Sequence, residues 1–207
     1  MKKLVIMGAG GHGKVVADCA RCVGYTDIEF LDDNRVVDNV LGFPVVGGVR
    51  DAKKYDKNNT DFFVAIGNNR VRVDLLNRLV DMGCCVTTLI HPKTVISEFA
   101  EIAKGTLVMP GAVINAGAKI GFGAIINTGV CVDHDCNIGT GVHISPGAVL
   151  SGTVSVGDGS WICSGAVVAN NITIGAGAKV AAGAAVINNV DDFVLVAGVP
   201  AVVKKSI

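Results

Sequence analysis

Three consecutive residues, Asp133-His134-Asp135, place an imidazole between two carboxylates in a stretch that holds few other charges. A carboxylate that holds one ring nitrogen of a histidine fixes its tautomer and raises the basicity of the other nitrogen. Such an imidazole can remove a proton from an amine or a hydroxyl near neutral pH. We therefore take His134 as a candidate general base, with an ordinary surface histidine as the alternative.

Three further histidines occur in different contexts. His143 follows nine residues after His134 and is a candidate to bound the same groove. His12 stands in a glycine-rich segment, where it is a candidate to contact a phosphate or a sugar. His91 precedes Pro92, and we interpret it as structural.

The available ligands argue against a metal centre. A zinc ion held as in γ-type carbonic anhydrases needs three histidines, but the repeat region around His134 holds only two. Cys19 and Cys22 form a lone CxxC pair, and no second pair is spaced to complete a site of four ligands. We expect no metal.

The glycine-rich segment reads Gly8-Ala9-Gly10-Gly11-His12-Gly13 and fits the GxGxxG pattern. It follows an apolar strand over residues 3–7 and precedes a helical stretch over 14–23, which is where such a loop approaches phosphate oxygens. Asp32 and Asp33 come about twenty residues later and are candidates to bind a ribose hydroxyl. One such half favours a mononucleotide diphosphate. Binding of a dinucleotide such as NAD, or a purely structural role of the glycines in packing, remain the alternatives.

The first ninety residues alternate between strands and helices. Further strands are predicted over 28–31, 61–66 and 85–89, and a helix over 70–82. This pattern predicts a small parallel α/β sheet, half of a Rossmann-like fold, in a domain of residues 1–89. Ligands bind at the carboxyl ends of parallel strands, so the glycine segment, Asp32-Asp33 and Gly67-Asn68-Asn69 should share one rim.

A six-residue repeat occupies the rest of the chain. Every sixth residue from Ile90 to Val186 is Ile, Val or Leu, seventeen in succession. Three places after each of them, from Gly105 to Asn189, stands Gly eleven times, Asn twice, Asp135 and Thr153. Gly, Asn and Asp tolerate the left-handed backbone that a tight corner needs. Such an array predicts a parallel β-helix over residues 90–207, with a C-terminal tail.

The side chains of each hexapeptide have predictable directions. The branched residue points inward, a small residue such as Ala112 or Cys136 sits beside it, and polar residues face out. Three hexapeptides close one triangular coil, so residues 102–191 make five coils of eighteen residues. His134 takes an outward position, toward solvent or a neighbouring subunit, whereas Cys136 belongs to the core.

Composition sets the remaining limits. Eighteen basic and eighteen acidic residues cancel, which gives no cationic surplus for nucleic acid or for a membrane surface. No stretch approaches the ~18 uninterrupted apolar residues that a membrane span requires. Seven cysteines, an odd number, without a secretion signal favour reduced thiols. We expect a cytoplasmic protein with no nucleic-acid or membrane partner.

Five stretches spread along the chain carry a family resemblance: Gly8–Gly13, Phe30–Asp33, Ala65–Asn69, His134–Gly139 and Gly198–Ala201. Together they resemble the NeuD/PglD-type family of sugar O- and N-acetyltransferases, over essentially the whole chain. The nearest resemblance is to the UDP-4-amino-sugar N-acetyltransferases. The hexapeptides, such as Ile120-Gly121-Phe122-Gly123-Ala124, also resemble those of left-handed β-helix acyltransferases, from which the left hand is taken.

The resemblance implies a homotrimer with active sites between adjacent β-helices, acetyl-CoA along the β-helix and a nucleotide-sugar held by the N-terminal domain. His134 would be the base and Asp135 its acidic companion, where close relatives have Glu. His143 and the backbone amide of Gly152 would contact the acetyl-CoA end, and Asn127 would lie near the acceptor. The residues implied to meet the nucleotide-sugar are Gly10, Gly11, His12, Gly13, Asp32, Asp33 and Asn68.

The expected reaction is direct transfer of an acetyl group to the 4-amino group of a UDP-4-amino-4,6-dideoxy sugar, with no acyl carrier on a cysteine. O-acetylation of a sialic acid by the same machinery is one alternative. A solenoid without catalytic activity and an NAD-dependent enzyme are two others.

Overall fold

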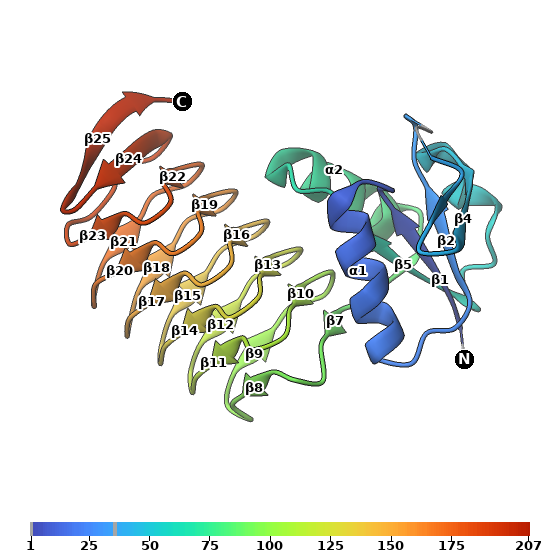
Figure 1. Ribbon diagram of the computed structural model, residues 1–207, viewed down its shortest axis with the longest axis horizontal. Coiled ribbons are helices and arrows are strands. Elements are labelled where there is room, and N and C mark those ends of the chain that lie inside the picture. The colour runs from blue at the N-terminus through green and yellow to red at the C-terminus, as the bar shows by residue number, and fades with distance from the viewer. Residues whose placement is uncertain (1, 35–36) are drawn as a thin grey trace. The chain divides into compact units, whose positions relative to one another are not determined.

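The computed structural model describes residues 2–34 and 37–207 of the chain. It divides into two compact units, Met1–His91 and Pro92–Ile207. Figure 1 shows an α/β unit followed by a stack of short strands. The two units are described separately below.

In its described residues, the first unit has one sheet, two α-helices and one 3-10 helix. The strand order is β3-β4-β2-β1-β5-β6, and β1 at the centre pairs in parallel with both β2 and β5. The elements are β1 (Lys3–Met7), α1 (Gly11–Cys22), β2 (Ile28–Leu31), β3 (Asn39–Val40), β4 (Phe43–Gly47), η1 (Val49–Lys54), β5 (Thr60–Val64), α2 (Asn69–Asp81), β6 (Cys85–Val86) and β7 (Leu89–Ile90).

The parallel core of this sheet agrees with the sequence-based expectation, and four details differ. The strand expected over 85–89 is divided into β6 and β7. Helix α1 begins at Gly11 rather than Lys14, so the end of the glycine segment forms the first helical turn. The strand expected over 61–66 ends at Val64. Strands β3 and β4 pair antiparallel, a hairpin that the sequence did not predict. Leu41 and Gly42 turn this hairpin with positive φ angles, and a leucine gives no turn signal.

The second unit is a parallel β-helix of two-residue strands. The strands are β8 (Val95–Ile96), β9 (Glu101–Ile102), β10 (Leu107–Val108), β11 (Val113–Ile114), β12 (Lys119–Ile120), β13 (Ile125–Ile126), β14 (Cys131–Val132), β15 (Asn137–Ile138), β16 (His143–Ile144), β17 (Val149–Leu150), β18 (Ser155–Val156), β19 (Trp161–Ile162), β20 (Val167–Val168), β21 (Thr173–Ile174), β22 (Lys179–Val180) and β23 (Ala185–Val186). Each pairs with the strand eighteen residues away, as His143 does with Trp161.

The strands form three flat sheets, and each sheet shows one column of outward side chains. We name the faces by these columns. The valine face (β8, β11, β14, β17, β20, β23) carries Val95, Val113, Cys131, Val149, Val167 and Ala185. The polar face (β9, β12, β15, β18, β21) carries Glu101, Lys119, Asn137, Ser155 and Thr173. The aromatic face (β10, β13, β16, β19, β22) carries Leu107, Ile125, His143, Trp161 and Lys179.

These columns correct one expectation. Outward positions were expected to be polar throughout, but this holds only for the polar face. Val167 is 46% exposed in the isolated chain and Val95 is 67% exposed. An apolar column on a solvent-facing sheet is a feature of surfaces that meet another protein.

The interior follows the repeat closely. The inward residue of every hexapeptide from Val108 to Val186 is buried, while the first three of the ladder are only partly covered. The small residues beside them are buried as well, including Ala112, Ala124 and Cys136. Burial of one branched side chain per hexapeptide holds the coils together, because short strands offer few hydrogen bonds each.

The corners also match the expected backbone. All eleven expected glycines, together with Asp135, Thr153 and Asn171, have positive φ angles. Asn189 is the exception, since it is absent from the residues with positive φ in the described chain. Its side-chain oxygen instead accepts a hydrogen bond from the amide of Thr173 at 2.9 Å. The regular coil therefore ends before Asn189.

The C-terminal segment is more ordered than the expected tail. Strands β24 (Val194–Gly198) and β25 (Ala201–Ser206) form an antiparallel hairpin, and β24 continues the aromatic face beyond β22. No helix among the described residues is both long enough and apolar enough to cross a membrane.

Candidate active site

Two clefts open at the carboxyl ends of the strands in the first unit. The larger, of about 680 Å³, is lined by Gly8, Asp32, Asp33, Arg50, Ile66 and Arg78 among others. The smaller, of about 560 Å³, is lined by Gly10, Gly11, Lys14, Asp32 and Asn34 among others. Asp32 lines both. The glycine segment and the acidic pair therefore meet around Asp32, whereas Gly67, Asn68 and Asn69 line neither cleft.

The glycines of the segment have two different roles. Gly8 has a φ of +107°, and a Cβ on Gly13 would lie 2.1 Å from the carbonyl oxygen of Gly8. These two glycines allow the strand and the helix to pack closely, which was the structural alternative for the motif. A Cβ on Gly10 or Gly11 would meet nothing within 4 Å. Gly10 and Gly11 thus leave open space beside the N-terminus of α1, where an anion is favoured.

The acidic pair holds the rim in shape. Asp32 accepts hydrogen bonds from the amides of Ala9 at 2.7 Å and Asn34 at 2.8 Å. Asp33 accepts one from the amide of Val49 at 2.9 Å. Carboxylate oxygens can accept further bonds, so both residues can still receive ribose hydroxyls.

His12 and Asn68 were also expected to meet a nucleotide-sugar, but neither lines the two clefts. Burial lowers the pKa of His12 to about 4, helped by the positive charge of Arg72, so the ring is neutral at physiological pH. Its Nε2 is buried without a hydrogen-bond partner among the described residues. Asn68 caps helix α2 by accepting from the amide of Val71 at 3.1 Å.

The loop beside His12 is held by a buried arginine that the sequence did not single out. Arg72 is 1% exposed, and its guanidinium donates to the carbonyl of Ile66 at 2.9 Å and to Asn69 Oδ1 at 3.0 Å. A guanidinium offers five donors in a fixed fork, so one side chain can fix several points of a loop. Charged residues of an amphipathic helix usually face solvent, so nothing in the sequence indicated that Arg72 would be buried.

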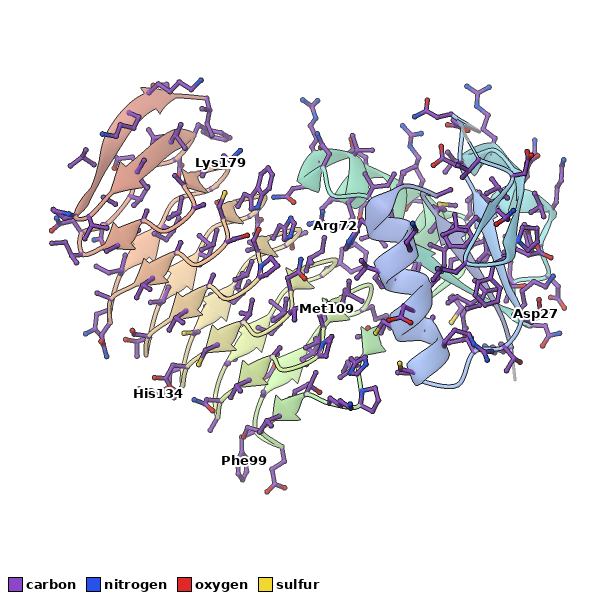
Figure 2. All side chains as sticks on the ribbon, in the orientation of Figure 1. Asp27, Arg72, Phe99, Met109, His134 and Lys179 are labelled. Carbon is purple, nitrogen blue, oxygen red and sulfur yellow. The ribbon has the colours of Figure 1, made fainter. Side chains whose placement is uncertain are left out.

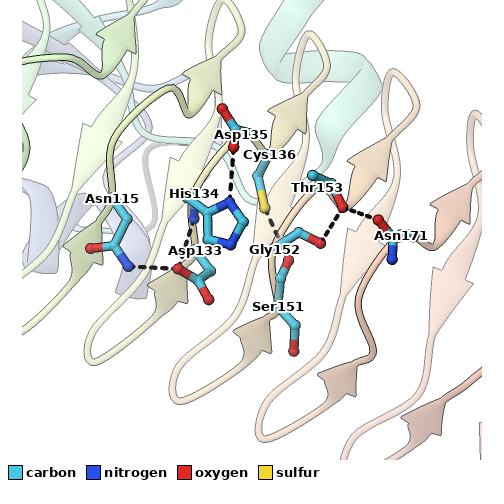
Figure 3. Close-up of polar contacts among 9 residues, drawn as sticks. All are labelled: Asn115, Asp133, His134, Asp135, Cys136, Ser151, Gly152, Thr153 and Asn171. Atoms are coloured by element: carbon cyan, nitrogen blue, oxygen red, sulfur yellow. Dashed lines mark hydrogen bonds and ion pairs between the residues drawn. The ribbon is translucent and has the colours of Figure 1, made fainter.

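In the second unit, His134 lies at the corner between the valine face and the polar face (Figure 3). Its Nδ1 is 2.8 Å from Asp135 Oδ2, and its backbone amide donates to Asp133 Oδ1 at 2.7 Å. Asn115, one coil earlier, donates to the same oxygen of Asp133 at 2.8 Å. One carboxylate therefore holds the imidazole and the other holds the backbone beneath it.

These contacts shift the charges of the corner. The hydrogen bond with Asp135, with the negative charges of Asp133 and Asp135, raises the pKa of His134 above its usual value. The hydrogen bonds from Asn115 and from the His134 amide lower the pKa of Asp133. A histidine with a raised pKa is a stronger base once it is deprotonated.

The other ring nitrogen, Nε2, lies over Gly152 on the next coil. A Cβ built on Gly152 would be 2.5 Å from Nε2 and 2.6 Å from Cε1 of His134. Only glycine leaves room for the imidazole in this position. The Gly152 amide hydrogen has no acceptor among the described residues. The residue that lies against the imidazole therefore carries an unpaired backbone donor, and Gly152 itself is buried.

The backbone of this corner is unusual in the same place. Asp135 and Thr153 stand one coil apart and have φ angles of 58° and 60°. The Thr153 hydroxyl oxygen lies 2.6 Å from the carbonyl oxygen of Gly152 and 2.5 Å from Asn171 Oδ1, so these two acceptors share its single proton. A left-handed conformation is costly for a β-branched residue, and such strain gathers at functional sites.

His143 and Asn127 form a separate cluster on the aromatic face, not beside His134. Asn127 Nδ2 is 3.5 Å from Nε2 of His143, while Asn127 Oδ1 accepts from the amide of Thr128 at 2.8 Å. Figure 2 shows that His134 and Lys179, the latter on the aromatic face, lie on different sides of the coil. Residues expected at one reaction centre therefore occupy two faces of one chain.

The structure confirms that Cys136 belongs to the core, as its place in the repeat predicts. Its thiol is buried, 1% exposed, and donates to the carbonyl of Ser151 at 3.2 Å. Burial raises the pKa of Cys136, so the thiol stays protonated and is a poor nucleophile. Among the described residues, no group of three His, Cys, Asp or Glu is placed to hold a metal ion.

Comparison with known proteins identifies a matching family model, a curated relative and similar solved structures. Residues 3–79 match the model of the PglD N-terminal domain. A curated relative, the UDP-N-acetylbacillosamine N-acetyltransferase of Bacillus subtilis (strain 168), is 40% identical over 109 residues. That match covers 51% of this chain and spans about half the length of the relative, 50%.

Two solved structures are similar over nearly their full length. The acetyltransferase domain of PglB from Neisseria gonorrhoeae FA1090, in complex with acetyl coenzyme A, is 42% identical with a TM-score of 0.96, covering 98% of this chain and 99% of that one. PerB from Caulobacter crescentus, in complex with CoA and GDP-perosamine, is 41% identical with a TM-score of 0.94, covering 99% and 98%.

The fold and the similar structures together define a left-handed β-helix acyltransferase, in which an α/β domain precedes the β-helix in the sequence. Within that class, the chain belongs to the NeuD/PglD-type family of sugar acetyltransferases.

Proposed function

We propose that this protein transfers an acetyl group from acetyl-CoA to the 4-amino group of a UDP-4-amino-4,6-dideoxy sugar in the cytoplasm. The observation that carries the proposal is the corner where Asp135 holds His134 at 2.8 Å and leaves Nε2 beside the Gly152 amide. Similarity to PglB with acetyl coenzyme A and to PerB with GDP-perosamine supports both substrate classes.

In the proposed reaction His134 acts as the general base. Acetyl-CoA supplies the acetyl group as a thioester. The amine nitrogen of the sugar forms a bond to the carbonyl carbon while Nε2 of His134 removes a proton from that nitrogen. The carbon–sulfur bond then breaks, the amide remains on the sugar, and the thiolate of CoA takes up the proton from His134. No covalent enzyme intermediate is required.

The Gly152 amide suits the charge that develops on the carbonyl oxygen. A backbone N–H aimed at an oxyanion stabilises the tetrahedral intermediate without reorganisation, and loss of one such donor costs about 10²–10³-fold in kcat. The amide of Gly152 is not used within the described chain, so it is available for this role.

The first unit would hold the nucleotide. Gly10 and Gly11 leave backbone space at the N-terminus of α1 for the diphosphate, and Asp32 and Asp33 would accept the ribose hydroxyls. His12 and Asn68 line neither cleft, so neither is assigned a contact with the nucleotide. Gly13 would contribute by packing rather than by contact.

We also propose that the active protein is a homotrimer. The valine face offers a column of six apolar or small side chains, and His134 stands at its edge. A second copy that covers this face would place its own surface against His134. The separation of His134 from His143 and Asn127 within one chain then has a reason, because the two clusters would serve one site from adjacent subunits.

The trimer is tested by a charge on the valine face. Val167→Asp should dissociate the assembly and reduce activity, since a buried unpaired carboxylate is costly at an interface. Thr173→Asp on the polar face is the matched control and should leave both unchanged. Mass from light scattering, with specific activity, checks the prediction. A Val167→Asp protein that remains trimeric would show that another surface assembles the protein.

The reaction is tested by offering the purified chain acetyl-CoA with a panel of acceptors and measuring thiol release. The panel holds UDP- and GDP-linked 4-amino-4,6-dideoxy sugars and free and CMP-linked sialic acid. Preferred turnover of the UDP-4-amino sugar, with an N-acetyl product by mass spectrometry, is the expected result. Turnover of sialic acid alone would establish the O-acetyl alternative, and tight NAD(H) binding would revive the dinucleotide reading.

A further inference from the structure

The aromatic face carries a stack of three side chains. Trp161, the chain's one tryptophan, lies between His143 and Lys179, its partners on the neighbouring strands. The rings of Trp161 and His143 are nearly parallel, with 5° between the planes and 5.5 Å between the centroids. The ammonium of Lys179 is 4.0 Å from the centroid of the indole. Because β16 and β22 flank β19 on opposite edges, the two partners meet opposite faces of the indole.

A hydrogen bond fixes the rotation of the indole in this stack. Its Nε1–H donates to Ser145 Oγ at 2.8 Å, and Ser145 is 4% exposed. Ser145 stands two residues after His143 on the same coil. The indole is therefore tied at its edge to the strand segment that carries the imidazole, while Trp161 remains 37% exposed.

This arrangement restricts His143. An imidazole on an exposed strand can occupy several rotamers. Here, one face of the ring rests on the indole, and its Nε2 is directed toward Asn127 at 3.5 Å. Rotation of the ring would give up the stacking contact. Groups held in the productive orientation before substrate arrives contribute more to a reaction than mobile ones.

We propose that Trp161 is a positioning residue for acetyl transfer, which holds the imidazole of His143 in the orientation that meets acetyl-CoA. Ser145 sets the angle of the indole, and Lys179 covers its other face. This role rests on the proposed function, since it is His143 that would contact the acetyl-CoA end. Trp161 itself acts through His143.

A double-mutant cycle tests the role. Trp161→Ala should lower kcat/KM for acetyl-CoA by about tenfold, and His143→Gln by at least as much. The double variant should match His143→Gln within about twofold, because residues that act through one another are not additive. Trp161→Phe keeps a flat ring and should restore most of the loss. Lys119→Ala, outward on the polar face, is the control. Independent, multiplying losses would overturn the proposal.

Fluorescence gives a readout that does not depend on activity. Tryptophan emission of the wild type reports this stack alone, so His143→Gln should change its intensity, while Lys119→Ala should not. Emission that does not change in His143→Gln would show that the two rings are not stacked in solution. This outcome can be obtained even if Trp161→Ala fails to fold. Wild-type protein that releases no thiol with any nucleotide amino sugar would overturn the proposed function. Wild-type turnover with additive losses would overturn only the role of Trp161.

Discussion

Two corner columns of the β-helix carry glycine at every left-handed residue, whereas the third carries Gly117, Asp135, Thr153 and Asn171 in succession. The third column lies between the valine face and the polar face and holds His134. In the two columns of glycine corners, each residue supplies the left-handed backbone conformation and has no side chain to make a further contact. At the third corner, side chains replace glycine at a cost of roughly 1–2 kcal/mol per left-handed residue.

The difference shows where side-chain contacts are made at the expense of the preferred backbone conformation. Asp135 holds the imidazole, and Thr153 ties the Gly152 carbonyl to Asn171. Each replacement adds a side-chain contact in this column, and that of Asp135 is made to His134 itself. The departures from the repeat thus point to the site more directly than the repeat itself does.

The largest expected effect comes from removing the base. His134→Ala should lower kcat by about 10²–10⁴-fold, as expected for loss of a general base. Binding of acetyl-CoA, measured by calorimetry, should change little because the imidazole acts on the amine. A variant that keeps more than half of the wild-type turnover would exclude His134 as the base.

A methyl group at Gly152 should separate catalysis from stability. In Gly152→Ala the new Cβ would lie 2.5 Å from Nε2, so the exposed imidazole must move. A displacement of about 1 Å can cost as much as ~100-fold in kcat. The melting temperature should stay near that of the wild type, because Gly152 is not among the residues with positive φ.

Gly159→Ala is the opposite control, on a glycine corner. Gly159 has a φ of +68° and open space around a Cβ, so the variant should lose roughly 1–2 kcal/mol of stability and retain its kcat. If both variants lost activity and stability alike, the contrast between the corners would fail.

A smaller effect is expected from the acidic companion. Asp135→Asn removes the charge that raises the pKa of His134. The base works only when deprotonated, so activity falls as the pH drops through this pKa. The variant's pKa is lower, and the acid limb of the kcat/KM profile should move to lower pH, with kcat reduced roughly tenfold. If the acid limb of the profile did not shift, it would report the titration of a group other than His134.

The smallest effect is expected at Cys136. Cys136→Ala should retain turnover within about twofold and lose about 1 kcal/mol of stability, because a buried thiol is removed from the core. Rapid-quench detection of an acetylated protein in the wild type, absent from the variant, would instead reveal a covalent carrier.

The two units differ in how much their sequences predicted. In the β-helix, the inward ladder and fourteen corners were predicted correctly, because one local rule repeats every six residues and each coil has the same surroundings. In the α/β unit, the central strands were predicted, but the β3–β4 hairpin and the burial of Arg72 were not. Those features depend on neighbours that are distant in the sequence.

The candidate site shows the same division. The carboxylates beside His134 are adjacent in the chain, so their contact could be expected from sequence. Trp161 and Lys179 could have been found by counting eighteen residues from His143, since stacked coils bring such residues together. The burial of Gly13 against Gly8 could not, because it depends on how closely the helix approaches the strand.

The sequence by itself determined the stacked coils, the left-handed corners and the outward place of His134, because each depends on the identity and spacing of nearby residues. Only the tertiary structure decided which nitrogen of His134 faces Gly152, which outward column is apolar, and that His143 lies on another face. Those outcomes depend on distances between coils, and side chains eighteen residues apart meet only after the backbone has closed its turn.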